Sequence, residues 1–219
     1  MLSNAPPVKV CGISRSEDAA LAVALGASAI GFVFWPDSPR YVDPMRAREI
    51  VDALPDGVLV VGVFVDQPVS AVVEIADSVA LDAIQLHGNE SVSDFAGVRQ
   101  RVIKAVPVGE SFDPATVDAL PADVTLLLDA HDPIRRGGTG RTIDWTIAAA
   151  VAARRDMILS GGLNAGNVAD AIARVRPRMI HVSSGVEAAP GHKDPGKLRE
   201  FFAAIDQAGL KAGTTGMHR

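Results

Sequence analysis

The chain has little cysteine, few aromatic residues and no excess of positive charge, and each shortage excludes a class of protein. A single cysteine, Cys11, among 219 residues rules out a disulfide framework and a cysteine-rich zinc site, and it suits a reducing cytoplasm. A net charge of −5 argues against sequence-independent nucleic-acid binding, which needs a basic face. Aromatic residues make up only 5% of the chain, which disfavours a base-stacking platform. We therefore expect no nucleic-acid partner.

Long hydrophobic runs are missing as well. No segment reaches the roughly 18 uncharged apolar residues that a membrane span needs. No basic N-terminal segment leads into an apolar stretch, so we expect no signal peptide. Apolar residues still make up 48% of the chain, which is the composition of a folded globular protein. The expectation is a cytoplasmic protein without a membrane partner.

What the sequence does contain is one pattern repeated eight times: a short β-branched run followed by an alanine-rich amphipathic stretch. Strands are expected at 8–11, 29–34, 59–65, 83–86, 102–105, 124–129, 157–160 and 179–183. Helices are expected at 16–25, 43–54, 68–77, 90–98, 113–120, 144–153, 164–175 and 194–207. Eight such units predict an α/β protein with a (β/α)8 TIM barrel in a single domain.

The extent of the barrel follows from where this pattern starts and stops. We place the barrel at 8–210, with flexible tails at 1–7 and 211–219. The strands are apolar nearly throughout, as in a parallel sheet covered by helices. A doubly wound open sheet is the competing architecture, and the regular units without a nucleotide fingerprint favour the closed barrel.

Polar residues at the strand ends are the candidates for chemistry, because a barrel of this kind carries its site at the carboxyl ends of its strands. The thiol of Cys11 ends the first strand and can act as a base, or it can be a small buried hydrophobe. Three leucines lead into Asp129, which is either a catalytic acid or a helix cap. Arg40, in a proline-stiffened loop after the second strand, is a candidate ligand contact or a solvated side chain.

Glycine-rich loops after the seventh and eighth strands predict a phosphate site. Glycines let the backbone approach an anion closely, and the following helix N-termini direct N–H groups toward it. These two loops are also where such barrels most often hold phosphate. The cradle would consist of Ser160, Gly161, Gly162, Ser184 and Gly185.

Together these strand ends resemble the phosphoribosylanthranilate isomerases of tryptophan biosynthesis over roughly residues 8–207. The matching motifs include Lys9-Val10-Cys11-Gly12-Ile13, Ser38-Pro39-Arg40-Tyr41, Gln85-Leu86-His87-Gly88, Gly137-Gly138-Thr139-Gly140, Leu159-Ser160-Gly161-Gly162-Leu163 and Ser183-Ser184-Gly185-Val186-Glu187. The resemblance implies an Amadori rearrangement of a phosphorylated small molecule, without a cofactor or a metal. Family members occur as monomers or dimers, so the resemblance implies a monomer or a homodimer here.

The resemblance also implies roles for individual residues. Cys11 matches the family's general base, Asp129 its general acid and Arg40 a substrate-binding arginine at the anthranilate side. The loops at Gly161-Gly162 and Ser184-Gly185 match the phosphate site. We assign His87, Gly138 and Gly140 to substrate contacts as well.

Three residues leave questions open. His181 stands where the family commonly has an aspartate, and if that aspartate pairs with a cation, the pairing is lost or replaced here. His131, close after Asp129, competes with it for the role of the acid. Lys9 lies two residues before Cys11, hence on the same strand face. It either favours the thiolate or serves only as an interior ion-pair residue.

Other functions compete with this one. A histidine-pathway isomerase performs the same rearrangement, but it carries an aspartate where this chain has Cys11. Indole-3-glycerol phosphate synthase needs a lysine and glutamate set that the strand ends do not show. The alternative outside the enzymes is a barrel that has no turnover and binds a phosphorylated ligand as a sensor or a scaffold.

Overall fold

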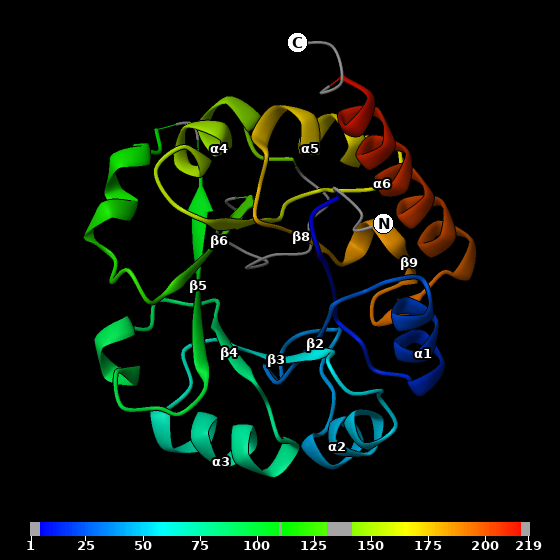
Figure 1. Ribbon diagram of the computed structural model, residues 1–219. Coiled ribbons are helices and arrows are strands. Elements are labelled where there is room, and N and C mark those ends of the chain that lie inside the picture. Colours follow the sequence, from blue (N-terminus) through cyan, green and yellow to red (C-terminus); the bar gives the residue numbers. More distant parts are fainter. Residues whose placement is uncertain (1–4, 110, 131–141, 216–219) are drawn as a thin grey trace.

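The computed structural model describes residues 5–109, 111–130 and 142–215. Its centre is a closed barrel in which strands β1 to β8 follow one another in chain order, and all eight adjacent pairs, including β8 with β1, are parallel. Figure 1 shows the helices arranged around the outside of this ring. The predicted (β/α)8 barrel is therefore confirmed.

The strands lie close to the expected positions. They are β1 (Val8–Cys11), β2 (Ala29–Val33), β3 (Leu59–Phe64), β4 (Ala83–Leu86), β5 (Arg101–Val108), β6 (Thr125–Ala130), β7 (Met157–Leu159) and β8 (Met179–Val182). The largest difference is in β5, which extends at both ends beyond the expected 102–105. The added Arg101 pairs with Ala83 of β4, and the residues added at the carboxyl end pair with β6, where Pro107 lies opposite Asp129.

The helices depart from expectation in the fourth and fifth units. The α-helices are α1 (Ser16–Ala24), α2 (Pro44–Asp52), α3 (Val69–Val79), α4 (Trp145–Ala152), α5 (Val168–Val175) and α6 (Pro195–Thr215). Units four and five contain only short 3-10 helices, η1 (Val92–Phe95) and η2 (Pro114–Ala119). The predictions of α-helices at 90–98 and 113–120 are therefore wrong. Gly97 and Pro121 limit these segments, since glycine and proline are the poorest helix formers.

Two other helix boundaries differ. Helix α5 begins at Val168 rather than at 164, because Asn164 forms a turn instead: its Oδ1 accepts from the backbone N–H of Gly166 at 2.9 Å. Helix α6 continues to Thr215, beyond the expected helix end at 207 and into the tail that was expected at 211–219. Between β8 and α6 the chain forms η3 (Ser184–Val186) and a hairpin of β9 (Glu187–Ala189) and β10 (His192–Lys193).

The hydrophobic core has two layers. One layer lies inside the barrel and includes Val61, Ile103, Leu127 and Ile158. A larger one packs the outward-facing strand residues against the helices. Alternation along each strand therefore leaves every second side chain inside the barrel, and those at the carboxyl ends are the ones that form the site.

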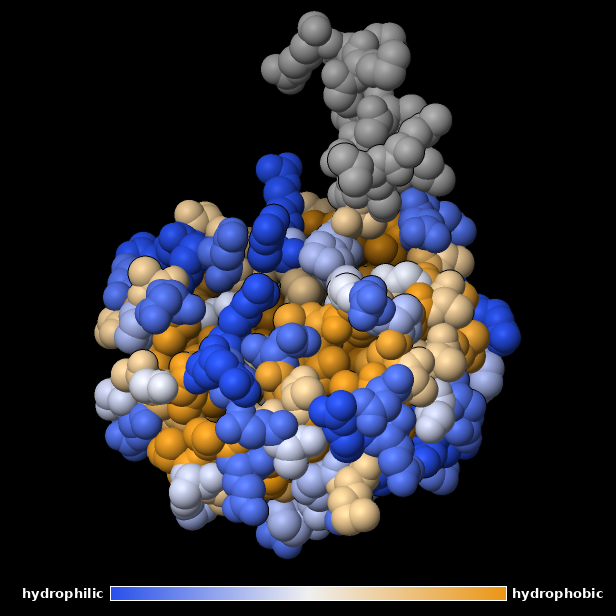
Figure 2. Space-filling model, turned by 60° about the horizontal axis from the view of Figure 1, so that its bottom comes forward, coloured by the Kyte–Doolittle hydropathy of each residue, from blue (hydrophilic) through white to orange (hydrophobic). Residues whose placement is uncertain are grey.

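The surface is mixed in polarity. In Figure 2, hydrophobic residues gather toward the middle of one face, with hydrophilic residues around them. Among the described residues, Tyr41 and Met45 are the exposed large hydrophobic side chains. Of the described helices, none has both the length and the apolar character to cross a bilayer.

Candidate active site

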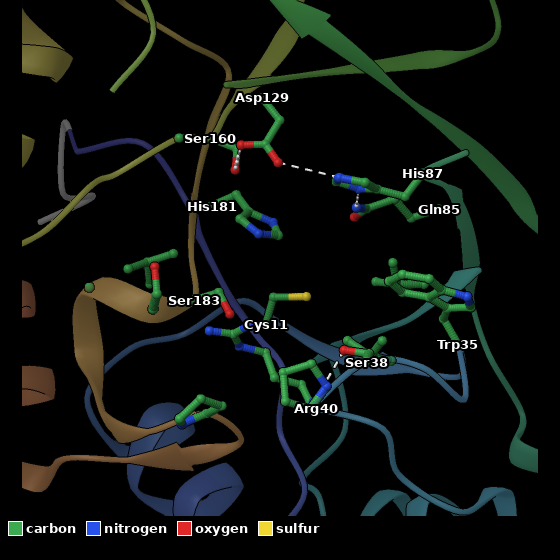
Figure 3. Close-up of a pocket in the computed structure, with 18 of the residues that line it drawn as sticks. Cys11, Trp35, Ser38, Arg40, Gln85, His87, Asp129, Ser160, His181 and Ser183 are labelled. Atoms are coloured by element: carbon green, nitrogen blue, oxygen red, sulfur yellow. Dashed lines mark hydrogen bonds and ion pairs between the residues drawn. The ribbon is translucent and has the colours of Figure 1, made fainter. Parts of the chain in front are cut away.

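A pocket of about 360 Å³ opens at the carboxyl ends of the barrel strands, within the range typical of small-molecule sites. Most of the predicted site residues line it: Cys11, Arg40, His87, Asp129, Ser160, Gly161, Gly162, Ser184 and Gly185. Figure 3 shows how the polar members converge from different strands. Gly138, Gly140 and His131 lie outside the described residues.

Cys11 reaches the pocket from the end of β1. Its side chain is almost fully buried and lies against Val33, Val63 and Trp35. Gly31, its neighbour on β2, makes the space: a Cβ at that position would lie 2.6 Å from the Cys11 sulfur. The thiol therefore lies among apolar side chains at the carboxyl end of the barrel, in space left by Gly31, with its sulfur toward the pocket (Figure 3).

Lys9 lies beneath Cys11 on the same strand face, as alternation predicts. Its Nζ donates to Oε1 of Gln85 and lies 3.4 Å from Nδ1 of His181. Burial lowers the pKa of Lys9, while the nearby Cys11 and Asp129 side chains oppose that shift. The lysine that was expected to support a thiolate is therefore in place, and its effect on Cys11 stays a prediction.

Asp129 enters the pocket from β6 with both carboxylate oxygens occupied. Its Oδ1 accepts from the backbone N–H of Ala130 at 2.9 Å and from Oγ of Ser160 at 3.1 Å. Its Oδ2 lies 3.3 Å from Nε2 of His87. These contacts hold the carboxyl group in one plane across the barrel mouth from Cys11, so the pocket has a potential acid and a potential base on opposite strands.

Ser160 makes a contact that the sequence did not predict. Its hydroxyl donates to Asp129, and its backbone N–H donates to the carbonyl of Leu128 at 2.9 Å. Both of its donors are therefore used within the protein, while the residue still lines the pocket beside Gly161.

The two glycine loops after β7 and β8 touch each other. Gly161 and Gly162 have φ values of 90° and 59°, in the left-handed region that favours glycine. A Cβ on Gly185 would lie 1.9 Å from the carbonyl oxygen of Leu163, so only glycine fits between the loops. Because α5 starts as late as Val168, the backbone around Gly162 is a turn and not the first turn of a helix.

Arg40 is held by a carboxylate that sequence reasoning did not assign. Its Nε donates to Glu187 at 2.9 Å and one terminal nitrogen donates at 2.7 Å. The same carboxylate accepts from the buried Nζ of Lys193 at 2.7 Å, and this ammonium also donates to the carbonyl of Cys11 at 2.6 Å. The cluster of Arg40, Glu187 and Lys193 therefore connects the loop after β2 with the hairpin after β8 and with the end of β1.

His181 is buried and points into the barrel, as its position on β8 predicts. Burial is the main reason why the pKa of His181 lies well below 6.5, and the positive charge of Lys9 adds to it. His87, Lys193 and Arg40 act in the same direction. The side chain is therefore neutral and meets Lys9 as a hydrogen-bond acceptor.

The lowered pKa of His181 makes stability depend on pH. Below pH 6.5 the unfolded chain binds a proton at His181 that the folded chain does not, so the free energy of unfolding falls as the pH falls. The expected slope from this group is up to about 1.4 kcal/mol per pH unit. Urea unfolding at pH 5 to 7 should show that His181→Gln removes this part of the slope. His192→Gln, which removes an exposed histidine, serves as the control, and an equal loss in both variants would contradict the assignment.

The described residues contain no group of three or more histidine, cysteine or acidic side chains arranged to hold a metal ion. The residues that sequence reasoning missed are Gln85, Glu187 and Lys193. Alternation on β4 places Gln85 on the same face as His87, which is a signal that a sequence does carry.

Comparisons with known proteins show which family the chain is similar to. The family model of N-(5'phosphoribosyl)anthranilate (PRA) isomerase matches residues 8–204. An N-(5'-phosphoribosyl)anthranilate isomerase of Pelobacter propionicus is 50% identical over 197 residues, which are 89% of this chain and 93% of that protein.

Solved structures of similar proteins have the same fold. The phosphoribosyl anthranilate isomerase of Thermotoga maritima has a TM-score of 0.85 at 41% identity, covering 92% of this chain and 99% of that one. Another, solved in complex with reduced 1-(o-carboxyphenylamino)-1-deoxyribulose 5-phosphate, has a TM-score of 0.81 at 39% identity, with 92% and 99% covered. The chain belongs to the N-(5'-phosphoribosyl)anthranilate isomerase family.

Proposed function

We propose that this chain catalyses the rearrangement of N-(5'-phosphoribosyl)anthranilate to 1-(2-carboxyphenylamino)-1-deoxyribulose 5-phosphate, a step of tryptophan biosynthesis. The observation that carries the proposal is the pocket of a family member in which Cys11 and Asp129 face one cavity from β1 and β6. The reaction needs an acid and a base at neighbouring atoms of one substrate, and a pocket with one of each on opposite sides meets that need.

The proposed acid is Asp129. Its proton goes to the ring oxygen of the ribose while the nitrogen lone pair helps to break the bond between C1 and that oxygen, which leaves an iminium at C1. The carboxylate that remains accepts hydrogen bonds from Ala130 and Ser160 and lies beside His87. Hydrogen bonds to the charged form of an acid favour its ionisation, so these partners support the transfer.

The proposed base is the thiolate of Cys11. It removes the proton from C2, the electron pair moves toward the iminium, and an enolamine results. Protonation at C1 and loss of the proton from the C2 hydroxyl give the ketone, so no atom is gained or lost overall. The ammonium of Lys9 stabilises a negative charge on the sulfur.

The phosphate and anthranilate ends of the substrate are assigned to the loops at the carboxyl ends of the strands. We place the phosphate on backbone N–H groups of the loops at Gly161, Gly162, Ser184 and Gly185, because these residues line the pocket and the glycines let the backbone approach an anion closely. Arg40 is assigned to the anthranilate carboxylate, with Glu187 fixing its guanidinium. Gly138 and Gly140 are assigned to the substrate as well.

The expected setting is the cytoplasm, in keeping with the lone, unpaired Cys11. A solved structure of the Thermotoga maritima relative describes monomers made from a dimeric phosphoribosylanthranilate isomerase. We expect a monomer or a homodimer for this chain, and sedimentation equilibrium distinguishes the two.

The proposal is tested by following the loss of anthranilate-type fluorescence with freshly generated phosphoribosylanthranilate. The folded wild-type chain should consume it and yield the carboxyphenylamino-deoxyribulose phosphate, identified by mass and by retention against the authentic compound. If the folded chain binds the reduced product analogue but shows no turnover, it is a ligand-binding barrel and the proposal is wrong.

A further inference from the structure

A chain of polar contacts crosses the barrel interior from β1 to β6. Lys9 Nζ donates to Oε1 of Gln85, Nε2 of Gln85 lies 2.8 Å from Nδ1 of His87, and Nε2 of His87 lies 3.3 Å from Oδ2 of Asp129. Lys9 and Gln85 are each only 1% exposed, and Asp129 is 7% exposed. Figure 3 shows Gln85 and His87 on one side of the pocket, with dashed lines from Gln85 to His87 and from His87 to Asp129.

The direction of every bond in this chain follows from its first member. A lysine ammonium has only donors, so the atom of Gln85 that faces it must be the carbonyl oxygen. The amide nitrogen of Gln85 therefore faces His87, and because it is itself a donor, Nδ1 of His87 must accept. This assignment rests on the chemistry of the ammonium, and not on how an amide was oriented.

The tautomer of His87 follows in turn. A neutral imidazole with an accepting Nδ1 carries its proton on Nε2, and this nitrogen is the one beside Asp129. We propose that Gln85 is a positioning residue that holds His87 in the Nε2–H tautomer, so that His87 donates to Oδ2 of Asp129. In the other tautomer two donors would meet between Gln85 and His87, and two lone pairs would meet between His87 and Asp129.

The consequence for the reaction rests on the proposed function. When Asp129 gives up its proton, the new charge on Oδ2 meets the Nε2–H of His87, whose nitrogen lies 3.3 Å away, while Oδ1 meets Ser160 and Ala130. A donor held in place near the site of developing charge stabilises the transition state. Gln85 thus acts on the acid through His87.

The tautomer is measured directly in protein labelled with 15N in its histidines, with the His87 signals assigned by their loss in His87→Asn. Two-bond 1H–15N correlation spectra should show Nε2 protonated and Nδ1 unprotonated in the wild type. Gln85→Glu keeps the length of the side chain and the acceptor for Lys9, but it presents an oxygen to His87. In this variant Nδ1 should become protonated.

The kinetic effect is measured on the same proteins. Gln85→Glu and Gln85→Met should each lower kcat by about ten- to hundredfold, as expected when the outer partner of a functional group is lost. KM should stay within about twofold, because the phosphate and anthranilate ends of the substrate are assigned to other residues. Gln100→Met is the matched control: Gln100 is also buried, but its Nε2 donates to Asp77 at 3.0 Å, outside the pocket, and kcat should stay at the wild-type value.

The outcomes separate this inference from the proposed function. A wild-type spectrum with Nδ1 of His87 protonated overturns the tautomer assignment whether or not the protein turns over, and so does an unchanged His87 spectrum in Gln85→Glu. Wild-type kcat in a Gln85→Glu protein whose tautomer has changed overturns the positioning role. An inactive wild type with the expected spectrum would overturn the proposed function alone.

Discussion

Replacing Cys11 by alanine is expected to lower kcat for phosphoribosylanthranilate by about 10²- to 10⁴-fold, the usual contribution of a general base. Alanine occupies most of the space of the cysteine side chain between Val33 and Val63 and introduces no polar group, so the fold should persist. KM should change little, because the phosphate and anthranilate ends of the substrate are assigned to other residues. Steady-state kinetics by loss of substrate fluorescence measures both constants.

Cys11→Ser is the control for this result. It restores the size and the hydrogen-bonding capacity of the side chain, but a hydroxyl ionises far less readily than a thiol with its pKa near 8.5. Activity should therefore remain low in both variants, with circular dichroism spectra like the wild type. A Cys11→Ala protein that keeps more than about a tenth of the wild-type kcat would show that the sulfur is not the base.

Glu187→Gln is expected to lower the free energy of unfolding by about 3–5 kcal/mol, the cost of breaking a buried ion pair by removing one partner. Burial alone would raise the pKa of Glu187, but Arg40 and Lys193 outweigh it and the pKa lies below 4.5. The substitution leaves the side chain's shape in place and removes the charge between two cations, one of which, Lys193, is 1% exposed.

Chemical denaturation at pH 7 measures this loss. The matched control is Asp52→Asn, which breaks the contact with Arg48 at 2.6 Å between side chains that are 57% and 44% exposed. The two pairs have nearly equal distances, so burial is what distinguishes them, and an exposed pair contributes little. Equal small losses in both variants would mean that the buried cluster does not hold the loops together.

The barrel itself was predictable because its signal is local. Each strand is a short apolar, mostly β-branched run, and the structure places all eight at or next to the expected residues. The predictions that are wrong are also local in origin. At 90–98 and 113–120 the amphipathic pattern predicts α-helices, but the chain forms only short 3-10 helices there. At Asn164 the start signal belongs to a turn before the helix.

A site residue was predictable where its position at the end of a strand alone places it in the pocket. A contact between two residues that are far apart in the sequence was not predictable. Cys11 and Asp129 end strands, so their placement at the pocket follows from the fold class. The partners that fix the site are far apart in sequence: Arg40 and Glu187 are separated by 147 residues, and Lys9 and Gln85 by 76. These pairs exist because the barrel closes, and no single segment of the sequence encodes them.

The most direct test of the account is a crystal structure of this chain with reduced 1-(o-carboxyphenylamino)-1-deoxyribulose 5-phosphate. In this complex the phosphate should lie on the loops at Gly161-Gly162 and Ser184-Gly185. The Cys11 sulfur and the Asp129 carboxylate should lie within about 3–3.5 Å of neighbouring atoms of the sugar chain, the distance of a reactive approach. A ligand whose phosphate lies elsewhere, or whose sugar carbons leave Cys11 and Asp129 on the same side and out of reach, would contradict it.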